Sequence, residues 1–246
     1  MAATVIDREN RWSGVAREYE RDAASANDFY VRYGKRTLDI FSAAGGLILL
    51  APVLFAVACS IKWTSRGPVF FRQVRLGKGG RPFHILKFRS MKAAEGSQDG
   101  LNITVAGDAR VTPVGRFLRR HKIDEIPQLW NVLRGEMSLV GPRPELPVYV
   151  SEYTREQRGV LSVSPGITDP ASLAYRNEEG ILAARENPEA FYRTRVLPDK
   201  LARNLAYLRK ITLRGDLRIL SETISSLFVF SEKKETPKGR PDSRAE

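Results

Sequence analysis

Two adjacent carboxylates, Asp124 and Glu125, are the residues of this sequence best suited to chemistry. The residues after them repeat at the i, i+3, i+4 and i+7 spacing of one helix face: Ile126, Leu129, Trp130 and Leu133. Pro127 fits a first turn and Gly135 a C-terminal stop, so the sequence places both acids at a helix N-terminus. The helix dipole would keep a carboxylate ionised there. An ionised Asp could act as a nucleophile, a metal ligand or only a helix cap, and capping is the commoner role for an isolated pair.

Cations flank this acidic pair on both sides. The run Arg119-Arg120-His121-Lys122 precedes it, and Arg143 follows between two prolines. An arginine held this way loses little freedom on binding and can grip two phosphate oxygens. Lys87 and Arg89 stand two residues apart on a predicted strand over residues 82–91, so they share one face. That face is either solvated, or it joins the acidic pair in binding an anionic substrate.

Composition points to anionic partners. The chain has 246 residues, 42% of them hydrophobic, which is enough for one ordinary domain with additions. Lys and Arg number 40 against 28 Asp and Glu, and the net charge of +12 favours nucleic acid, anionic lipid or phosphorylated substrates. Cys59 is the single cysteine, which excludes an intramolecular disulfide and a cysteine zinc site. With only two histidines, a histidine-rich metal site is not expected either.

The most apolar stretch runs from Ile40 to Ile61 and contains no charged residue. About 20 apolar residues are what a bilayer crossing needs. Three interpretations compete: a buried core helix, a transmembrane span, and a re-entrant helix that enters and leaves on one side. Pro52 near the middle predicts a bend. Cations lie on both flanks, so a simple span would place one group outside, against the positive-inside tendency. These features favour the re-entrant helix.

The rest of the chain divides around this helix. Residues 1–30 form a polar arm without the apolar core of a signal peptide, and residues 231–246 form a charged tail that we expect to be disordered. We expect residues 31–66 to hold the re-entrant helix and residues 67–230 to form the domain that carries the acidic pair. Within that domain we expect a hairpin of strands 69–74 and 82–91, a helix from Leu146 to Arg158, and two amphipathic helices. The apolar positions of those two helices could pack on the core or lie in a membrane interface: Leu201, Leu205, Leu208 and Ile211 in one, and Leu217, Leu220, Ile224, Leu227 and Phe228 in the other.

Together these segments resemble the bacterial sugar transferases, the monotopic phosphoglycosyl transferases that start glycan assembly on polyprenyl phosphate. The resemblance covers about residues 35–230. It rests on KRTLDIF, on the apolar stretch with its proline, on GPVFFRQVRLGKGGRPFHILKFRSM, on RFLRRHKIDEIPQLWNVLRGEMSLVGPRPE, and on SPGIT. It implies an α/β fold, mostly helical with a small β-hairpin or sheet, anchored by a re-entrant helix and interfacial helices. The implied location is the bacterial inner membrane, with the catalytic domain on the cytoplasmic face.

The implied reaction transfers a sugar 1-phosphate from a nucleoside diphosphate sugar to polyprenyl phosphate, and it releases a nucleoside monophosphate such as UMP. The resemblance makes Asp124 the nucleophile that forms a covalent phospho-sugar intermediate, and Glu125 its metal-binding or basic partner. It implies Mg²⁺ or Mn²⁺ at this dyad. Arg143 matches a phosphate-binding position, and the substrate-binding set is completed by Lys87, Arg89, Arg119 and Arg176. The implied partners are the two substrates and the lipid bilayer, without nucleic acid, and a homodimer is allowed.

Two departures from the family pattern bear on these roles. Asp169-Pro170 stands after SPGIT where the family usually has Gly-Trp, which affects the role carried to Arg176. Ala51-Pro52 replaces the Ser-Pro of some relatives, so the bend would rest on proline alone. Three alternatives stay open: direct attack by polyprenyl phosphate with Asp124 only a metal ligand, a basic membrane-anchored nucleic-acid-binding protein, and a scaffold whose dyad is only a cap.

Overall fold

A computed structural model describes residues 29–92 and 104–229 of the chain. The predicted polar arm, up to residue 28, and the predicted charged tail lie outside the described residues. The α-helices and strands are, in chain order, α2 (Lys35–Thr64), β1 (Phe70–Leu76), β2 (Pro82–Phe88), α3 (Pro113–Arg120), α4 (Gln128–Leu133), β3 (Ser138–Val140), α5 (Pro147–Val150), β4 (Gly166–Thr168), α6 (Pro170–Ala174), α7 (Glu178–Ala183), α8 (Pro188–Phe191), α9 (Leu197–Leu208) and α10 (Leu213–Val229). Short 3₁₀ turns at Lys78–Gly80, Ile123–Glu125 and Gln157–Ser162 and π turns at Tyr30–Gly34 and Tyr192–Val196 complete the fold.

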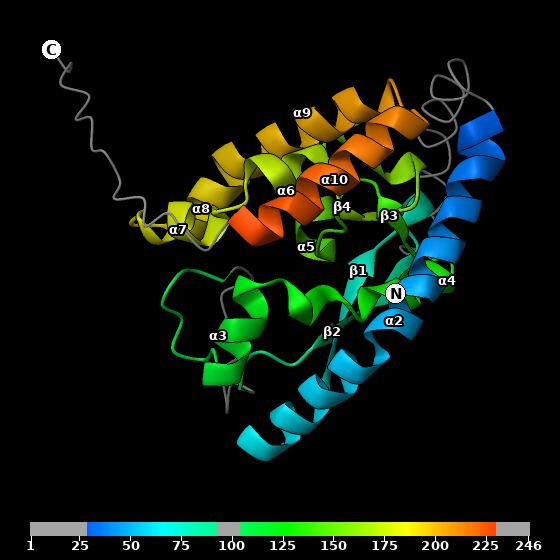
Figure 1. The fold of residues 1–246 in the computed structure, drawn as a ribbon. Coiled ribbons are helices and arrows are strands. Elements are labelled where there is room, and N and C mark those ends of the chain that lie inside the picture. Colours follow the sequence, from blue (N-terminus) through cyan, green and yellow to red (C-terminus); the bar gives the residue numbers. More distant parts are fainter. Residues whose placement is uncertain (1–28, 93–103, 230–246) are drawn as a thin grey trace, which may run out of the picture.

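Helix α2 runs along one side of the molecule. Helices α9 and α10 lie at the end of the molecule opposite the C-terminal part of α2 (Figure 1). Helix α2 is long and apolar enough to cross a membrane, and its apolar stretch is almost entirely exposed. Phe41 and Phe55 are 74% and 73% exposed. This exposure contradicts the interpretation of α2 as a buried core helix, because only one side of the helix, with Ala43 and Ile61, is buried against the other described segments.

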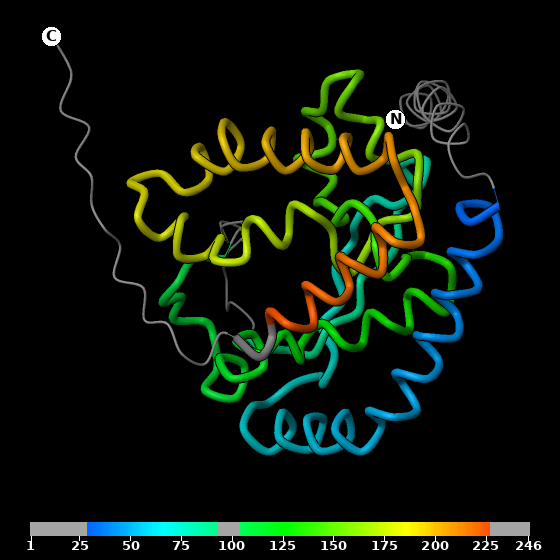
Figure 2. Tube along the Cα trace, turned by 45° about the horizontal axis from the view of Figure 1, so that its top comes forward, coloured from blue at the N-terminus to red at the C-terminus, as the bar shows by residue number. Residues whose placement is uncertain are grey.

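The middle of α2 is bent. Figure 2 shows its trace turning between the blue and the cyan parts, in the region of the sequence that holds Pro52. Proline has no N–H, so the carbonyl four residues earlier has no helical partner and the helix can open there. The bend agrees with the one expected from the sequence. Its membrane role stays a prediction.

The first half of α2 is fastened to the domain by polar contacts. The Arg36 guanidinium donates to the carbonyls of Val132 and Leu133, at the C-terminal end of α4, at 2.6 and 2.9 Å. Asp39 is buried and accepts a 2.8 Å hydrogen bond from the backbone N–H of Leu139 in β3. These contacts fix the charged start of the apolar helix on α4 and β3.

Strands β1 and β2 form the predicted antiparallel hairpin, with Phe70 opposite Phe88 and Leu76 opposite Pro82. A second sheet was not predicted: β3 and β4 pair in parallel, with Ser138 opposite Gly166. Glycines allow this pairing, because a Cβ on Gly166 would lie 2.1 Å from the backbone nitrogen of Gly141. The predicted small β component of a mostly helical fold is thus present as two two-stranded sheets among the described residues.

The two predicted amphipathic helices behave differently. Helix α9 buries Leu201, Leu205 and Leu208 in the main core cluster, so an interfacial position for its apolar face is wrong. Helix α10 buries Ile219 but leaves Leu217 and Ile224 about half exposed. The interfacial prediction therefore survives only for α10.

The predicted helix from Leu146 to Arg158 is also wrong, because the chain breaks between α5 and the 3₁₀ turn Gln157–Ser162. Thr154 and Gln157 exchange hydrogen bonds that start the second segment: each side chain accepts from the other's backbone N–H, at 2.9 and 3.2 Å. This reciprocal capping is a sequence signal for a new helix start that the apolar spacing concealed.

Candidate active site

The acidic pair lies in a 3₁₀ turn rather than in the first turn of α4. Lys122, two residues after the end of α3, has a left-handed backbone (φ 55°), which a residue with a side chain rarely adopts. The turn Ile123–Glu125 follows, and Pro127 immediately precedes α4. This reversal of the chain between two short helices presents Asp124 and Glu125 next to β2. The predicted C-terminal stop is confirmed, because Gly135 has a φ of 79°.

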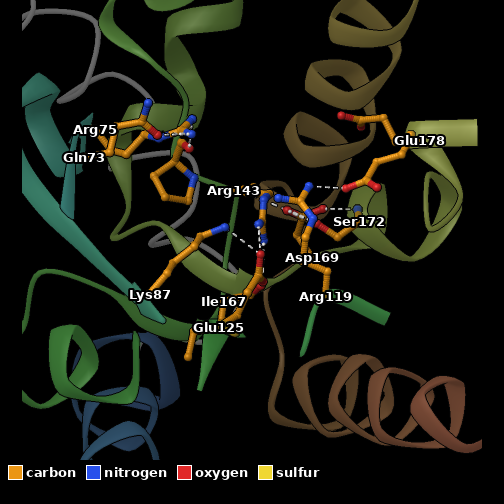
Figure 3. A network of polar contacts seen from close by, with 12 residues as sticks. Gln73, Arg75, Lys87, Arg119, Glu125, Arg143, Ile167, Asp169, Ser172 and Glu178 are labelled. Atoms are coloured by element: carbon orange, nitrogen blue, oxygen red, sulfur yellow. Dashed lines mark hydrogen bonds and ion pairs between the residues drawn. The ribbon is translucent and has the colours of Figure 1, made fainter. Parts of the chain in front are cut away.

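Glu125 is the centre of a charged cluster (Figure 3). The Lys87 ammonium, from β2, donates to its Oε1 at 2.7 Å. The Arg143 guanidinium, from the loop after β3, donates to both of its oxygens, at 3.2 Å for Oε2. Burial alone would raise the pKa of Glu125, but the charges of Arg143 and Lys87 hold that pKa well below its ordinary value. Glu125 is therefore an ionised carboxylate that gathers two cations from distant parts of the sequence.

Asp124 is in the opposite situation. Its side chain is buried, and Oδ1 has no hydrogen-bond partner among the described residues. Burial, together with the negative charge of Glu125, raises the pKa of Asp124 above its ordinary value. This direction is opposite to the one expected from a helix N-terminus, because desolvation of a buried acid disfavours its charged form. The dyad is asymmetric: Glu125 is compensated and Asp124 is not.

The loop that carries Arg143 is held by Asp169. The backbone N–H of Arg143 donates to Asp169 Oδ2 at 2.9 Å, while Oδ1 accepts from the backbone N–H of Ser172 at 2.6 Å. Asp169 is fully buried and also caps α6. The departure from the family pattern at Asp169-Pro170 therefore has a visible structural role, which is to join the arginine loop to α6.

The other predicted binding residues lie around this cluster in different ways. Arg119 pairs with Glu179 of α7 and lies 3.6 Å from the Met91 sulfur. The Arg89 guanidinium donates to the backbone carbonyls of Ser65 and Arg66 at 2.9 and 2.8 Å, so it ties β2 to the end of α2 instead of joining Lys87. Lys87 and Arg89 diverge because β2 ends at Phe88.

Arg176 lies in the turn between α6 and α7, where burial lowers the pKa of its guanidinium. Its binding role stays a prediction.

Sequence reasoning missed Asn131. Its amide nitrogen donates to the carbonyl of His84 at 2.8 Å, and its oxygen accepts from the backbone N–H of Leu86 at 2.9 Å. These two bonds fix the edge of β2 against α4, and hence Lys87 against Glu125. An amide flanked by the apolar residues Trp130 and Val132 was the available signal.

The dyad can be tested as a magnesium site. Mg²⁺ prefers oxygen ligands, and proteins usually hold it through one or two carboxylates together with substrate phosphates. Asp124 fits, since one buried oxygen has no partner among the described residues. Glu125 fits less well, because Lys87 and Arg143 already occupy both of its oxygens. The described residues contain no group of three or more His, Cys, Asp or Glu side chains placed to hold a metal. The donor set therefore suits an ion brought in with substrate phosphates.

The sequence from residue 30 to residue 230 matches the protein family described as bacterial sugar transferase. The chain belongs to this family. Membership makes it a phosphoglycosyl transferase, in agreement with the resemblance found from the motifs.

Relatives of this bacterial sugar transferase carry informative names. A UDP-glucose:undecaprenyl-phosphate glucose-1-phosphate transferase of Caulobacter vibrioides is 41% identical over 199 residues, which are 79% of this chain and 69% of the relative. A UDP-N-acetylgalactosamine-undecaprenyl-phosphate N-acetylgalactosaminephosphotransferase of Aeromonas hydrophila is 38% identical over 197 residues, 79% of this chain and 43% of the relative. An exopolysaccharide production protein of Rhizobium leguminosarum is 37% identical over 198 residues, 78% of this chain and 94% of the relative. This bacterial sugar transferase thus spans most of some relatives and less than half of others.

Proposed function

We propose that this protein transfers a sugar 1-phosphate from a UDP-sugar to polyprenyl phosphate through a covalent intermediate on Asp124. The observation that carries the proposal is the asymmetry of the dyad. Asp124 has a buried oxygen without a partner among the described residues, and beside it Glu125 gathers Lys87 and Arg143. A carboxylate without a partner next to clustered cations suits nucleophilic attack on a bound phosphate.

In the first step, the Asp124 carboxylate attacks the phosphorus that carries the sugar. A bond forms between a carboxylate oxygen and this phosphorus, and the bridging P–O bond of the diphosphate breaks. The electron pair of that bond leaves with UMP, and Asp124 holds the sugar phosphate as a mixed anhydride. In the second step, a phosphate oxygen of polyprenyl phosphate attacks the same phosphorus. The bond to Asp124 breaks, and the products are the polyprenyl diphosphate sugar and the regenerated carboxylate.

Glu125 acts in this scheme as a positioning residue. It holds Lys87 and Arg143 on one side of Asp124, and each cation keeps N–H donors that Glu125 does not use. These donors are available to the diphosphate oxygens, on which negative charge grows as UMP leaves. Asp169 keeps Arg143 in place through its backbone N–H.

Mg²⁺ would supply charge neutralisation between the Asp124 carboxylate and the diphosphate that it attacks. Asp124 Oδ1 and substrate phosphates would be its ligands. We expect EDTA to abolish UMP release and added Mg²⁺ to restore it, whereas release that continues in EDTA would remove the metal from the proposal.

UMP release and trapping of the intermediate test the reaction. The detergent-solubilised protein is given Mg²⁺, undecaprenyl phosphate and a panel of UDP-sugars that includes the glucose and N-acetylgalactosamine compounds. Without acceptor, a donor labelled in the sugar-linked phosphate should leave the label on the protein, and Asp124→Asn should remove it. Asp199→Asn, at an exposed carboxylate of α9, is the matched control and should keep the label.

The direct-attack alternative predicts a different result. Release of UMP that requires acceptor, without labelled protein at any time, would leave Asp124 as a metal ligand only. Release that survives Asp124→Asn would remove Asp124 from both versions.

We further propose that α2 is re-entrant in the bacterial inner membrane and that the catalytic domain faces the cytoplasm. The bend in α2 and its uncovered apolar surface support this topology (Figure 2). In a Cys59→Ser background, Tyr33→Cys and Arg72→Cys should both react with an impermeant maleimide from the cytoplasmic side only. Leu49→Cys, at an exposed apolar position of α2, should stay unlabelled. Labelling of residues 33 and 72 from opposite sides would show a span.

A further inference from the structure

An apolar cavity of about 400 Å³ lies between the second half of α2, the β-hairpin and the start of α4. Its lining includes Leu54, Phe55 and Ala58 of α2, Leu86 and Phe88 of the hairpin, and Trp130 of α4. This volume falls within the range of about 300–1,000 Å³ typical of small-molecule sites. We call this cavity the α2 groove.

The α2 groove is open as well as apolar. Phe55 is 73% exposed and Trp130 is 52% exposed, although both side chains border it. Large apolar surfaces without a cover normally mark a site that another apolar body occupies. The lining offers almost no polar surface, so it suits a hydrocarbon chain and excludes a charged headgroup.

The groove and the charged cluster share the strand β2. Successive side chains of a strand point to opposite faces, so Leu86 and Phe88 face the groove while Lys87 faces Glu125. Trp130 borders the groove only five positions after Glu125 in the chain. One strand thus separates a surface for an anionic group from a surface for a hydrocarbon chain.

We propose that the α2 groove binds the isoprene units nearest the phosphate of the polyprenyl phosphate acceptor. This inference rests on the proposed function, because it assigns the lipid half of that reaction to a place. The acceptor combines a phosphate with a methyl-branched chain, and the two faces of β2 match its two parts. The chain would lie along α2 and pass the start of α4, with its phosphate at the Lys87 face. A groove lined by aromatic rings suits a branched chain, whose methyl groups can pack on the ring faces.

A matched pair of substitutions on α2 tests the groove. Ala58→Trp fills it, whereas Ala56→Trp places the same side chain at an exposed position of the same helix outside the lining. We expect Ala58→Trp to raise the KM for undecaprenyl phosphate about tenfold or more, the scale of losing contact with two buried methylene groups. Its KM for the UDP-sugar should stay within about twofold of wild type, which also shows that the variant is folded. Ala56→Trp should leave both constants unchanged.

Chain length provides the second measurement. In the wild type, the KM for the acceptor should decrease as the isoprenoid chain lengthens from a short isoprenyl phosphate, such as geranyl phosphate, to undecaprenyl phosphate. In Ala58→Trp, this KM should depend less on chain length. Phe55→Ala changes an exposed side chain and enlarges the groove, so it should weaken the dependence without unfolding the protein.

The outcomes separate the two proposals. An unchanged acceptor KM in both Ala58→Trp and Phe55→Ala would overturn the groove as the isoprenoid site. If the variants raise the acceptor KM equally for short and long acceptors, the groove is not the isoprenoid site, and it is assigned to ordinary membrane acyl chains. A wild-type protein that releases no UMP with any sugar nucleotide would instead refute the proposed function.

Discussion

The charged cluster around Glu125 and the apolar surface along α2 lie on the two faces of the same hairpin, and they satisfy their side chains in opposite ways. In the cluster, Lys87, Arg143 and Glu125 are partly buried and paired with one another. On α2, large apolar side chains such as Phe55 and Leu49 are exposed without a cover among the described residues. The polar face is therefore paired within the protein, while the apolar face is left largely uncovered by the described residues.

Each face has one informative exception. In the cluster it is Asp124, whose buried oxygen has no partner among the described residues. On α2 it is the first half of the helix, where Arg36 and Asp39 make hydrogen bonds to α4 and β3. The first exception marks where a substrate is expected to react. The second shows how a helix with an exposed apolar surface is attached to the rest of the fold.

The largest expected effect separates the two acids of the dyad. If the proposed function holds, Asp124→Asn should lower the rate of UMP release about 10³-fold or more, since it removes the proposed nucleophile. Its melting temperature should stay the same or rise, because a buried carboxylate without a partner becomes a neutral amide. Glu125→Gln should instead lower the free energy of unfolding by about 3 kcal/mol, because it leaves the partly buried Lys87 and Arg143 without their counter-charge.

Thermal unfolding and UMP release measured on both variants check this prediction. If Asp124→Asn lowers the melting temperature as much as Glu125→Gln does, Asp124 belongs to the structural network and the asymmetry of the dyad is not real.

An intermediate effect is expected at Asp169. Asp169→Ala removes the acceptor for the Arg143 backbone N–H and the cap of α6, so we expect about a tenfold loss in kcat/KM. Asn187→Ala is the matched control, because it removes the cap of α8. The Asn187 side chain accepts a hydrogen bond from the backbone N–H of Ala190 at 3.0 Å. Both variants should lose about 1 kcal/mol of stability. A loss of kcat/KM that is equal in the two would show that capping alone explains the effect.

The smallest expected effect on function, a few-fold change in membrane binding, lies in the comparison of α9 with α10. Leu205→Ala on α9 should lower the free energy of unfolding by about 2–5 kcal/mol, because Leu205 is in the core. Leu217→Asp on α10 should change that free energy by no more than about 0.5 kcal/mol, since Leu217 is 48% exposed. It should nevertheless reduce, by a few-fold, flotation of the protein with vesicles containing phosphatidylglycerol.

Ser221→Asp, which adds the same charge at an exposed polar position of α10, should leave flotation closer to wild type. Equal loss of flotation in Leu217→Asp and Ser221→Asp would assign the effect to charge repulsion and not to the apolar stripe.

The sequence by itself determined the features that depend on neighbours along the chain. The hairpin followed from alternating residues around a glycine turn, and the end of α4 followed from Gly135, the left-handed residue that the structure also has. The long apolar helix and its bend followed from composition and from Pro52. Local conformational preferences and hydrophobic periodicity are sufficient for such features.

Only the tertiary structure decided which of the two acids is compensated. Lys87 lies 38 positions and Arg143 18 positions from Glu125, and no local pattern indicates that both converge on it rather than on Asp124. The same reason applies to Asp169, whose partner Arg143 is 26 positions away, and to Arg89, which turned toward the end of α2. The apolar stripes of α9 and α10 look alike in sequence, yet that of α9 is buried and that of α10 is partly exposed. Burial and charge pairing depend on which distant segments meet, and that is a property of the folded chain.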